Sequence, residues 1–527
     1  MTATELARAT VEALLGVGTR HVVVAPGSRN APISLALADA AAAGVITLHS
    51  RIDERTGAFL ALGIAKSSRF PVAIVTTSGT AAANLHPAVM EAAHAGIGLI
   101  AVTADRPARL RGTVANQTTD QVGIFGSAAR TTDVAEPAQL VGALTGVEDG
   151  PVHLNLQLDD PLLPTDRFVP TTVRPEREPW VRGTPHLLDQ GPATVVVAGD
   201  DSGPGPRVLA EAAGWPLLAE PTSGARNGPN VIRGYRLLLG TELGRRIERV
   251  VVAGVPTLSR PVQQLLAREG IEVVSRKARG RWPLRPHPVA FEYDGPYGVT
   301  GPDTSGWLEQ WRTADRELSS GIRGVLDAHP ELTPYDVAAT VHAALPAGGL
   351  LHVGASNPIR DLDLMAGGYP VGERRLVIGN RGLAGIDGTL STAIGATLGR
   401  PHSTRALLYV GDVTFLHDLT GLLIGPAEER PDLTIVVAND DGGSIFATLE
   451  QGAPAYAERF EKLFGTPHGA DLGALCSGLR VPHWRVSDRA ELAHALANPN
   501  GGIDVVEVSL RRDNRRELDA QIRALVR

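Results

Sequence analysis

Two clusters of acidic residues and glycines each follow an apolar run near the end of the sequence. Gly411 and Asp412 come after the run at 406–410, and residues 439–443 (Asn-Asp-Asp-Gly-Gly) come after the run at 433–438. Glycine-bounded apolar runs that alternate with helical patterns are typical of buried strands in a parallel α/β sheet. Ligands bind at the carboxyl ends of such strands. We therefore expect the two clusters to be neighbours on one edge of a sheet.

Carboxylates beside glycine turns suit a hard cation such as Mg²⁺. This ion takes one or two protein carboxylates and completes its octahedral shell with water and phosphate oxygens. Asp412 and Asp440 would supply the carboxylates, while Gly442 and Gly443 would let backbone groups approach a phosphate closely. The alternative is that both aspartates only cap turns or helices, as most aspartates after strands do. From the residues alone, both interpretations remain open.

A second set of polar groups follows an expected strand at 21–25. Residues 25–32 (APGSRNAP) form a tight turn that presents Ser28 and Arg29 at the end of this strand. Arginine in that place suits bidentate binding of a carboxylate. A surface turn with a solvated arginine is the competing interpretation, and it would be preferred if this turn stood alone.

Glu54 opens an expected helix that continues through residues 58–66. A charged residue at a helix start usually serves as capping or as part of a solvated face. A glutamate carried into an apolar cleft would instead have a raised pKa and could transfer protons. The sequence alone does not choose between these two roles.

Further hydroxyl and amide groups follow the expected strands at 72–76 and 99–102. Residues 76–87 form another strand–glycine–helix junction, with Ser78 and Thr80 on either side of Gly79. Residues 115–120 place Asn116 and Gln117 in a loop. Groups of this kind at strand ends are typical of a ligand-binding edge in an α/β domain.

The elements that must position these groups form three regions of alternating strand and helix patterns. We expect an α/β protein with three doubly wound parallel-sheet domains at residues 1–175, 185–325 and 330–527. A linker rich in Pro, Arg and Thr at 164–185 separates the first two, and a stretch rich in Pro, Gly and aromatic residues at 279–307 leads to the third. The first and third regions look like similar units, each with glycine-rich strand ends.

Composition excludes several classes of protein. The chain has 527 residues, of which 43% are hydrophobic, and a formal net charge of −7. The negative charge argues against a nucleic-acid-binding surface. Cys476 is the single cysteine, which excludes disulfides and zinc ribbons within one chain. Thr2 and Glu5 predict a capping box rather than a signal peptide, and no apolar run approaches the roughly 18 residues of a membrane span, so we expect a cytoplasmic protein.

Nine short motifs occur in one order over nearly the whole chain: APGSRNAP at 25–32, DER at 53–55, SGTAAANLHPA at 78–88, TADRP at 103–107, ANQ at 115–117, SNPIRD at 356–361, NRGLAGIDG at 380–388, GDVTFLHD at 411–418 and NDDGGSIF at 439–446. In this set the chain resembles the 2-succinyl-5-enolpyruvyl-6-hydroxy-3-cyclohexene-1-carboxylate (SEPHCHC) synthases, a family of thiamine-diphosphate enzymes of menaquinone biosynthesis. The resemblance is strong in the two outer regions and weak in the middle one.

The resemblance implies a fold, cofactors and an assembly. The three domains would be pyrimidine-binding, middle and diphosphate-binding, in chain order. Thiamine diphosphate and Mg²⁺, with Mn²⁺ as a substitute, would bind between the first domain of one subunit and the third domain of another, in a homodimer or tetramer. In the family's metal motif this chain has Val413 in place of the usual glycine and Asp440 in place of the usual asparagine. The extra charge of Asp440 would tighten the metal and weaken the diphosphate.

The resemblance also assigns roles to single residues. Glu54 would hydrogen-bond the aminopyrimidine ring, Ile386 would hold the cofactor in its bent shape, and Gly442 would bind the metal through its backbone together with Asp412 and Asp440. The remaining expected cofactor contacts are Ser78, Gly79, Thr80, Gly411 and Gly443.

By the same resemblance, the enzyme would decarboxylate 2-oxoglutarate and add the succinic-semialdehyde carbanion to isochorismate. Both substrates are polyanions, and Arg29, Arg360 and Arg381 would be their carboxylate clamps. Ile445, Phe446 and Leu449 would form an apolar wall, although ordinary packing on a helix is a fair alternative for the last two. The other expected substrate contacts are Ser28, Asn116, Gln117 and Ser356; a basic residue of the middle domain is left unassigned between Lys277 and Arg279.

Three alternatives stay open. Another thiamine enzyme, such as an acetolactate synthase or a 2-oxoacid decarboxylase, would keep Glu54, Asp412 and the turn at 440–442, but would not need three carboxylate-binding arginines. A non-catalytic binding module would have no use for all of these groups together. A flavin or nicotinamide dehydrogenase is disfavoured because the chain lacks a G-x-G-x-x-G fingerprint.

Overall fold

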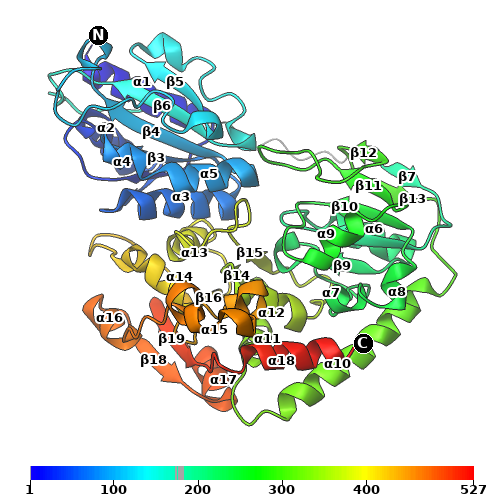
Figure 1. Cartoon of the computed structure of the whole chain (residues 1–527). Helices are drawn as coiled ribbons and strands as arrows, with labels where there is room; N and C mark the ends of the chain where they lie inside the picture. The colour runs from blue at the N-terminus through cyan, green and yellow to red at the C-terminus, as the bar shows by residue number, and fades with distance from the viewer. Residues whose placement is uncertain (1, 173–174, 176–182, 527) are drawn as a thin grey trace.

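The computed structural model describes residues 2–172, 175 and 183–526 and divides into three lobes, each built on a parallel sheet (Figure 1). Most of the predicted linker at 164–185 is described, but its residues 173, 174 and 176–182 lie outside the described part. The predicted α/β class of parallel-sheet domains is confirmed. The domain boundaries remain a prediction.

The first lobe has a six-stranded sheet in the order β2-β1-β3-β4-β6-β5, with every neighbouring pair parallel. The central strands β3 and β4 are buried at every position, because helices cover both faces of the sheet. The expected strand at 72–76 matches β3 residue for residue. The strands are β1 (His21–Val24), β2 (Thr47–Ser50), β3 (Val72–Thr76), β4 (Leu99–Asp105), β5 (Arg130–Val134) and β6 (Val152–Gln157).

Side chains cap the first turns of two helices in the first lobe. Thr2 and Glu5 form the predicted capping box at the start of α1, and Asp53 caps α3 by accepting hydrogen bonds from the backbone N–H groups of Arg55 and Thr56. The helices are α1 (Ala3–Gly16), α2 (Ala31–Ala42), α3 (Glu54–Ser68), α4 (Thr80–Ala83) and α5 (His86–Ala95), with 3₁₀ turns at Ala108–Leu110, Gly126–Ala128, Pro137–Leu140 and Val147–Asp149.

The middle lobe has a five-stranded parallel sheet in the order β12-β11-β10-β8-β9 and a separate pair formed by β13 and β7. Its long helix α10 (Trp307–Asp327) leads to the third lobe, and its buried face includes Trp307 and Trp311. The strands are β7 (His186–Leu188), β8 (Thr194–Ala198), β9 (Leu217–Ala219), β10 (Arg249–Ala253), β11 (Glu272–Arg276), β12 (Phe291–Tyr293) and β13 (Tyr297–Val299); the helices are α6 (Gly205–Ala213), α7 (Tyr235–Leu238), α8 (Glu242–Arg245) and α9 (Arg260–Leu266), with a 3₁₀ turn at Pro221–Ser223.

The third lobe repeats the topology of the first. Its strand order is β15-β14-β16-β17-β19-β18, which becomes the order of the first sheet when β14 is counted as strand one. The strands are β14 (Leu350–Val353), β15 (Leu376–Ile378), β16 (Ala406–Gly411), β17 (Leu433–Asn439), β18 (His483–Val486) and β19 (Ile503–Ser509). This confirms the expectation that the first and third regions are similar units.

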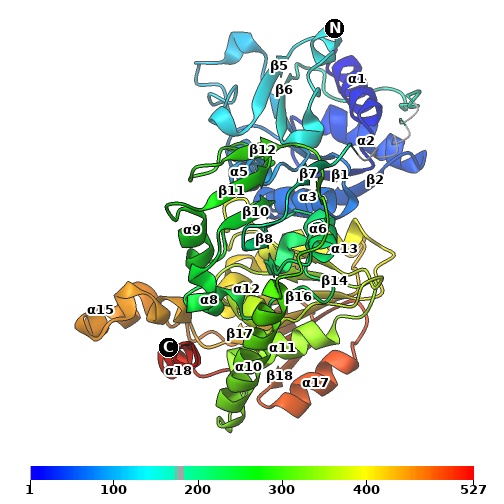
Figure 2. The same cartoon turned by 90° about the vertical axis from the view of Figure 1, so that its right-hand side faces the viewer.

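The helices of the third lobe include several short ones around its strand ends. Figure 2 shows the segment around α15 projecting away from the body of the molecule. The helices are α11 (Pro334–Ala344), α12 (Asn357–Met365), α13 (Thr389–Leu398), α14 (Asp412–His417), α15 (Ala457–Phe460), α16 (Leu472–Gly478), α17 (Arg489–Ala497) and α18 (Arg515–Ala524), with 3₁₀ turns η6 (Leu419–Leu422), η7 (Ser444–Thr448), η8 (Glu450–Gly452) and η9 (Pro454–Tyr456) and a π turn at Glu461–Gly465.

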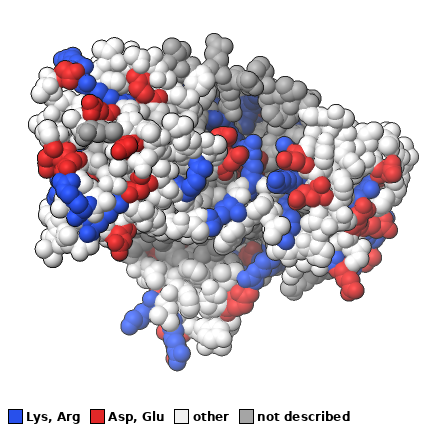
Figure 3. All heavy atoms as spheres, turned by 90° about the horizontal axis from the view of Figure 1, so that it is seen from above, with Lys and Arg blue, Asp and Glu red and all other residues white. Residues whose placement is uncertain are grey.

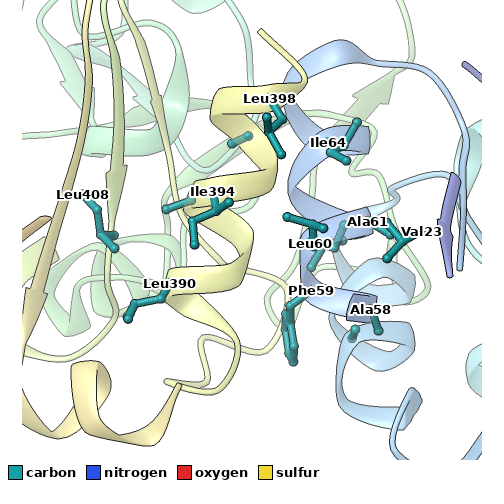
Figure 4. Close-up of a cluster of buried hydrophobic side chains, with 14 of the residues drawn as sticks. Val23, Ala58, Phe59, Leu60, Ala61, Ile64, Leu390, Ile394, Leu398 and Leu408 are labelled. Carbon is teal, nitrogen blue, oxygen red and sulfur yellow. The ribbon is translucent and has the colours of Figure 1, made fainter. Parts of the chain in front are cut away.

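Helices α3 and α13 join the first and third lobes through one continuous apolar core (Figure 4). Leu60 and Ile64 of α3 belong to this core together with Leu390 and Ile394 of α13. The helices approach so closely that a Cβ added at Gly63 would lie 2.0 Å from the carbonyl oxygen of Thr392. The two lobes therefore meet backbone to backbone.

Charged side chains of both signs are interspersed on the face seen from above, and basic ones gather where the left and right parts of that view meet (Figure 3). Within residues 2–172, 175 and 183–526, no helix has the length and apolar character needed to cross a membrane.

Candidate functional site

The two acidic clusters lie at neighbouring strand ends of the third sheet, as predicted. Strands β16 and β17 pair in parallel, with Gly411 opposite Ala438. Asp412 is buried at the first position of α14, and its Oδ2 accepts a hydrogen bond of 2.9 Å from the backbone N–H of Gly442. One carboxylate thus ties the two strand ends together.

Asp440 carries the second carboxylate of this edge. Burial, and then the negative charge of Asp412, raise the pKa of Asp440 to about 7, although Ser444 and two arginines act in the opposite direction. A buried carboxylate whose negative charge disfavours ionisation of a half-buried neighbour forms, with that neighbour, a site that a divalent cation would stabilise. The chemistry of the pair therefore fits a hard metal ion.

His468 is a further side chain at this edge that sequence reasoning missed. Its Nε2 lies 3.2 Å from Oδ2 of Asp412, and its Nδ1 lies 3.5 Å from Oδ1 of Asp441. It comes 56 residues after Asp412 and carries no local motif, so only the fold brings it here. Within the described residues, no group of three or more His, Cys, Asp and Glu side chains is arranged to hold a metal ion; Mg²⁺ needs only one or two carboxylates.

The glycine turn after β17 is closely packed. The N–H of Gly443 donates to the carbonyl oxygen of Gly465 at 2.7 Å, and the N–H of Ser444 donates to the carbonyl oxygen of Gly442 at 3.1 Å. A Cβ on Gly442 would lie 2.1 Å from the Gly465 oxygen. The glycines are therefore required for close approach of two backbone segments, as well as being available to a ligand.

The expected apolar wall lies directly after this turn. Ile445, Phe446 and Leu449 are half-buried. We expected Phe446 and Leu449 to lie on a helix. Instead, Phe446 lies on the 3₁₀ turn η7, and Leu449 lies just beyond its end. The ring of Phe446 packs 5.8 Å from that of Phe464, which gives it one packing partner within its own lobe.

Ser356, Arg360 and Arg381 follow β14 and β15 on the same edge. Nη1 of Arg360 donates to the carbonyl oxygen of Ser356 at 2.6 Å. Burial lowers the pKa of Arg360, and the positive charge of Arg381 lowers it further. Ser356 has φ +70°, a conformation that side-chain-bearing residues rarely adopt and that occurs at active sites as well as in turns.

Arg381 is buried at the junction of the three lobes. Its Nη2 donates to Oγ1 of Thr257 at 3.1 Å, while its buried Nε has no hydrogen-bond partner among the described residues. Arg381 also lines a cavity of about 590 Å³ together with Lys277 and Arg279 of the middle lobe. Three aspartates also line this cavity, but Lys and Arg residues outnumber them by five to three. The unused donor of Arg381 and this excess of positive charge fit the binding of a carboxylate.

The remaining predicted residues lie at the carboxyl edge of the first sheet. Arg29 follows β1, and its Nη1 donates to the carbonyl oxygen of Leu158 at 3.2 Å and lies 3.7 Å from Asp160. Ser28 beside it is exposed. Arg29 therefore belongs to a different edge from Arg360 and Arg381 within one chain.

Two loops on this first edge are bound to each other. The hydroxyl of Ser78 donates to the carbonyl oxygen of Gln117, and the Gln117 amide donates to the carbonyl oxygen of Ser78, both at 2.8 Å. Gln121 accepts a hydrogen bond from the N–H of Gly79 at 3.0 Å. Asn116, Gln117 and Thr80 are exposed. The expected cofactor loop and the expected substrate loop thus form one unit.

Glu54 is the first residue of α3, next to the third lobe of its own chain. Its neighbours are held there: Thr420 donates a hydrogen bond of 2.9 Å to Asp53, and Arg55 donates one of 2.9 Å to the carbonyl oxygen of His417. Among the described residues, none forms a hydrogen bond or ion pair with the Glu54 carboxylate itself. The backbone at Glu54 is fixed while its side chain keeps its acceptor capacity.

The predicted residues therefore form two groups in one chain, one at each sheet edge. The first-edge group comprises Ser28, Arg29, Glu54, Ser78, Gly79, Thr80, Asn116 and Gln117; the third-edge group comprises Ser356, Arg360, Arg381, Ile386, Gly411, Asp412, Asp440, Gly442, Gly443, Ile445, Phe446 and Leu449. Their individual roles remain predictions.

Comparison with known proteins adds two kinds of finding. Residues 4–124 match the family model described as "Thiamine pyrophosphate enzyme, N-terminal TPP binding domain", and residues 364–508 match the model described as "Thiamine pyrophosphate enzyme, C-terminal TPP binding domain". These two segments contain most of the first-edge and third-edge groups.

Three relatives that match this chain over nearly their whole length carry the same name. A 2-succinyl-5-enolpyruvyl-6-hydroxy-3-cyclohexene-1-carboxylate synthase from a Nocardioides species is 61% identical, covering 99% of this chain and 98% of the relative. Synthases of the same name from an Arthrobacter species and from Kineococcus radiotolerans are 46% and 44% identical, covering 100% and 99% of this chain and 92% and 99% of the relatives.

Proposed function

The chain belongs to the SEPHCHC synthase family of thiamine-diphosphate enzymes, and we propose from this that it joins 2-oxoglutarate to isochorismate in menaquinone biosynthesis, in the cytoplasm, with Mg²⁺ as its metal. The observation that carries the proposal is the pair of carboxylates Asp412 and Asp440 at neighbouring strand ends, on the edge that also holds Arg360 and Arg381.

Asp412, Asp440 and the carbonyl of Gly442 would hold Mg²⁺, and the cation would in turn hold the diphosphate. Mn²⁺ could replace it, because both ions prefer oxygen ligands in octahedral geometry. When bound, thiamine diphosphate supplies the carbanion chemistry that releases CO₂ from a 2-oxoacid. The contacts of Ser78, Gly79, Thr80, Ile386, Gly411 and Gly443 would place its rings and phosphates.

Glu54 would hold and move a proton at the aminopyrimidine ring. A carboxylate on the first turn of a helix whose neighbours are fixed can keep one orientation through repeated proton transfers. Arg29, Arg360 and Arg381 would bind the substrate carboxylates, because a guanidinium group forms paired, charge-assisted hydrogen bonds with them. Ser28, Asn116, Gln117 and Ser356 would orient the remaining polar groups, and the apolar wall would exclude water from the ring of isochorismate.

We propose that the two groups complete one site across a subunit interface. The first-edge group of one chain would face the third-edge group of a second chain in a homodimer, which a tetramer would repeat. Glu54 would then serve the metal site of the partner rather than its own.

An activity assay separates this function from that of a related decarboxylase. Protein, Mg²⁺ and thiamine diphosphate are mixed with 2-oxoglutarate or pyruvate, with and without isochorismate, and CO₂ and product are measured. We expect CO₂ only from 2-oxoglutarate and a coupled product only with isochorismate. Glu54→Gln should bind the cofactor by calorimetry but release no CO₂. Release of CO₂ from pyruvate alone would instead assign a decarboxylase or an acetolactate-synthase-like enzyme.

A further inference from the structure

We propose that Lys66 and Glu91 of the first lobe are positioning residues for Arg381, because Lys66 holds the backbone two residues before it and Glu91 holds the two residues directly after it. This inference rests on the proposed function, in which Arg381 binds a substrate carboxylate. The two side chains reach across the lobe boundary to the segment 379–383, so that they act on Arg381 through its backbone and not through contact with substrate.

Glu91 lies on α5 and holds the segment from one side. Its Oε1 accepts the N–H of Gly382 and its Oε2 accepts the N–H of Leu383, each at 2.7 Å. The Glu91 side chain is buried, with an exposed fraction of 4%. Two charge-assisted hydrogen bonds from consecutive amides to one buried carboxylate fix both the position and the direction of a backbone.

Gly382 makes this contact possible by its lack of a side chain. A Cβ at Gly382 would lie 2.6 Å from the backbone oxygen of Glu91 and 3.0 Å from its Oε2. The segment therefore lies directly against α5, and Arg381, one residue earlier, leaves this anchored backbone toward the cavity of Lys277 and Arg279.

Lys66 lies near the end of α3 and holds the segment from the other side. Its Nζ donates a hydrogen bond to the carbonyl oxygen of Gly379, and the side chain is buried with an exposed fraction of 4%. Burial raises the pKa of Asp200, and the positive charge of Lys66 opposes that rise. At Asp201, burial also acts upward, but the hydrogen bonds from Arg69, with smaller contributions from charges that include Lys66, leave the pKa lowered. The Lys66 charge therefore has carboxyl partners in the middle lobe. Burial of this ammonium group is thus compensated.

The same two helices connect the segment to the rest of the proposed site. Helix α3 begins with Glu54 and carries Lys66 twelve residues later, about 18 Å along its axis. Helix α5 also contacts the middle lobe, because the N–H of Arg281 donates a hydrogen bond of 2.9 Å to the carbonyl oxygen of Ala93 on this helix. Displacement of the segment 379–383 would therefore move Arg381 relative to both other lobes.

The first arm of the test measures backbone protection and needs no activity. In Glu91→Gln, one amide N–H must face the –NH₂ group of the glutamine, so we expect hydrogen exchange of the peptide covering 379–388 to be at least about tenfold faster. Lys66→Met, of similar length without the charge, should accelerate the same peptide. Glu12→Gln is the matched control, because Glu12 accepts the N–H groups of Thr171 and Thr172 at 2.8 Å each, on another part of the first lobe.

The second arm measures kinetics with 2-oxoglutarate and isochorismate. Arg381→Ala identifies the substrate whose KM depends on Arg381. We expect Glu91→Gln to raise the KM for that same substrate about 10- to 100-fold with a smaller change in kcat, since misplacing a binding group by about 1 Å has effects of this size. The double variant should be no worse than Arg381→Ala alone. Glu12→Gln should leave both KM values unchanged.

Each outcome decides one point. Unchanged hydrogen exchange of the peptide 379–388 in both Glu91→Gln and Lys66→Met would show that these side chains do not hold this backbone. Faster exchange with unchanged KM values would show that the two side chains hold the backbone but do not position Arg381. Effects of Glu91→Gln and Arg381→Ala on KM that add in full would show the same. If the wild-type protein releases no CO₂ from 2-oxoglutarate, the proposed function fails, and the exchange arm alone still decides whether Lys66 and Glu91 hold this backbone.

Discussion

Asp440, once ionised, brings a second negative charge to the proposed metal edge, where an amide would bring none. A carboxylate attracts Mg²⁺ more strongly than a neutral oxygen does, but it also repels a diphosphate bound to the same ion. Asp440→Asn should therefore weaken binding of Mg²⁺ alone about tenfold and strengthen binding of thiamine diphosphate at saturating Mg²⁺. Titration calorimetry measures both affinities. Equal Mg²⁺ affinity in wild type and variant would place Asp440 outside the metal shell.

Asp418 makes the stability of the protein depend on pH, at a position away from the proposed metal edge. Its Oδ2 accepts the N–H of Ser391 at 2.7 Å, and its Oδ1 has no hydrogen-bond partner among the described residues. Burial raises the pKa of Asp418 from an ordinary 3.8 to about 6. Between pH 3.8 and about pH 6, Asp418 keeps its proton in the folded protein but has lost it in the unfolded chain. The free energy of unfolding therefore falls as pH rises through this range, and the whole loss of stability is present above about pH 6.

Asp418→Asn removes this ionisation. Relative to wild type, the variant should gain stability on going from about pH 4 to pH 8, by at most about 3 kcal/mol. Urea unfolding of both proteins at the two pH values measures the difference. The prediction fails if the stability difference between variant and wild type is the same at both.

At the scale of elements, the crossing of α3 and α13 depends on glycine. A Cβ at Gly395 would lie 2.1 Å from the carbonyl oxygen of Leu60, and backbone cannot move aside as a side chain can. Gly395→Ala should therefore separate the helices and destabilise the protein by about 1–3 kcal/mol despite the better helix propensity of alanine.

The control for this substitution is Gly324→Ala. Gly324 is exposed on α10, and a Cβ there would meet no atom within 4 Å. It should raise stability by up to about 1 kcal/mol. Thermal unfolding of both variants measures the contrast, and a Gly395→Ala protein as stable as wild type would contradict the backbone contact.

The same elements show how far sequence reasoning extends. Strand β3 was predictable to the residue, because a parallel strand covered on both faces is a continuous apolar run. The adjacency of Asp412 and the turn after β17 followed from strand order alone. The roles of Glu54 and Ile386 rest on resemblance. His468 and Glu91 were not predictable: each looks like an ordinary polar residue until tertiary contacts bring it to a distant segment.

At the scale of the molecule, two sheets of identical topology pack through equivalent helices. Helix α3 connects β2 to β3, and α13 connects β15 to β16, which are the corresponding strands of the third sheet. Their contact is reciprocal, because Gly63 approaches Thr392 while Gly395 approaches Leu60. Each chain thus has the two proposed ligand edges in fixed relation, one with Glu54 and one with the proposed metal ligands Asp412 and Asp440, and two chains would offer two complete combinations.

Mixed dimers test whether those combinations form between chains. Chains with Glu54→Gln and chains with Asp412→Ala should each be inactive alone: the first lacks the proton-transfer group, and the second should lose Mg²⁺-dependent binding of thiamine diphosphate. If Glu54 of one chain serves the metal of another, a mixed dimer contains one intact site and one doubly defective site. Random mixing should then restore roughly a quarter of wild-type activity. CO₂ release from 2-oxoglutarate after co-refolding measures it. A site built within one chain predicts no recovery, because every chain carries one defect, and that result would reject the shared site.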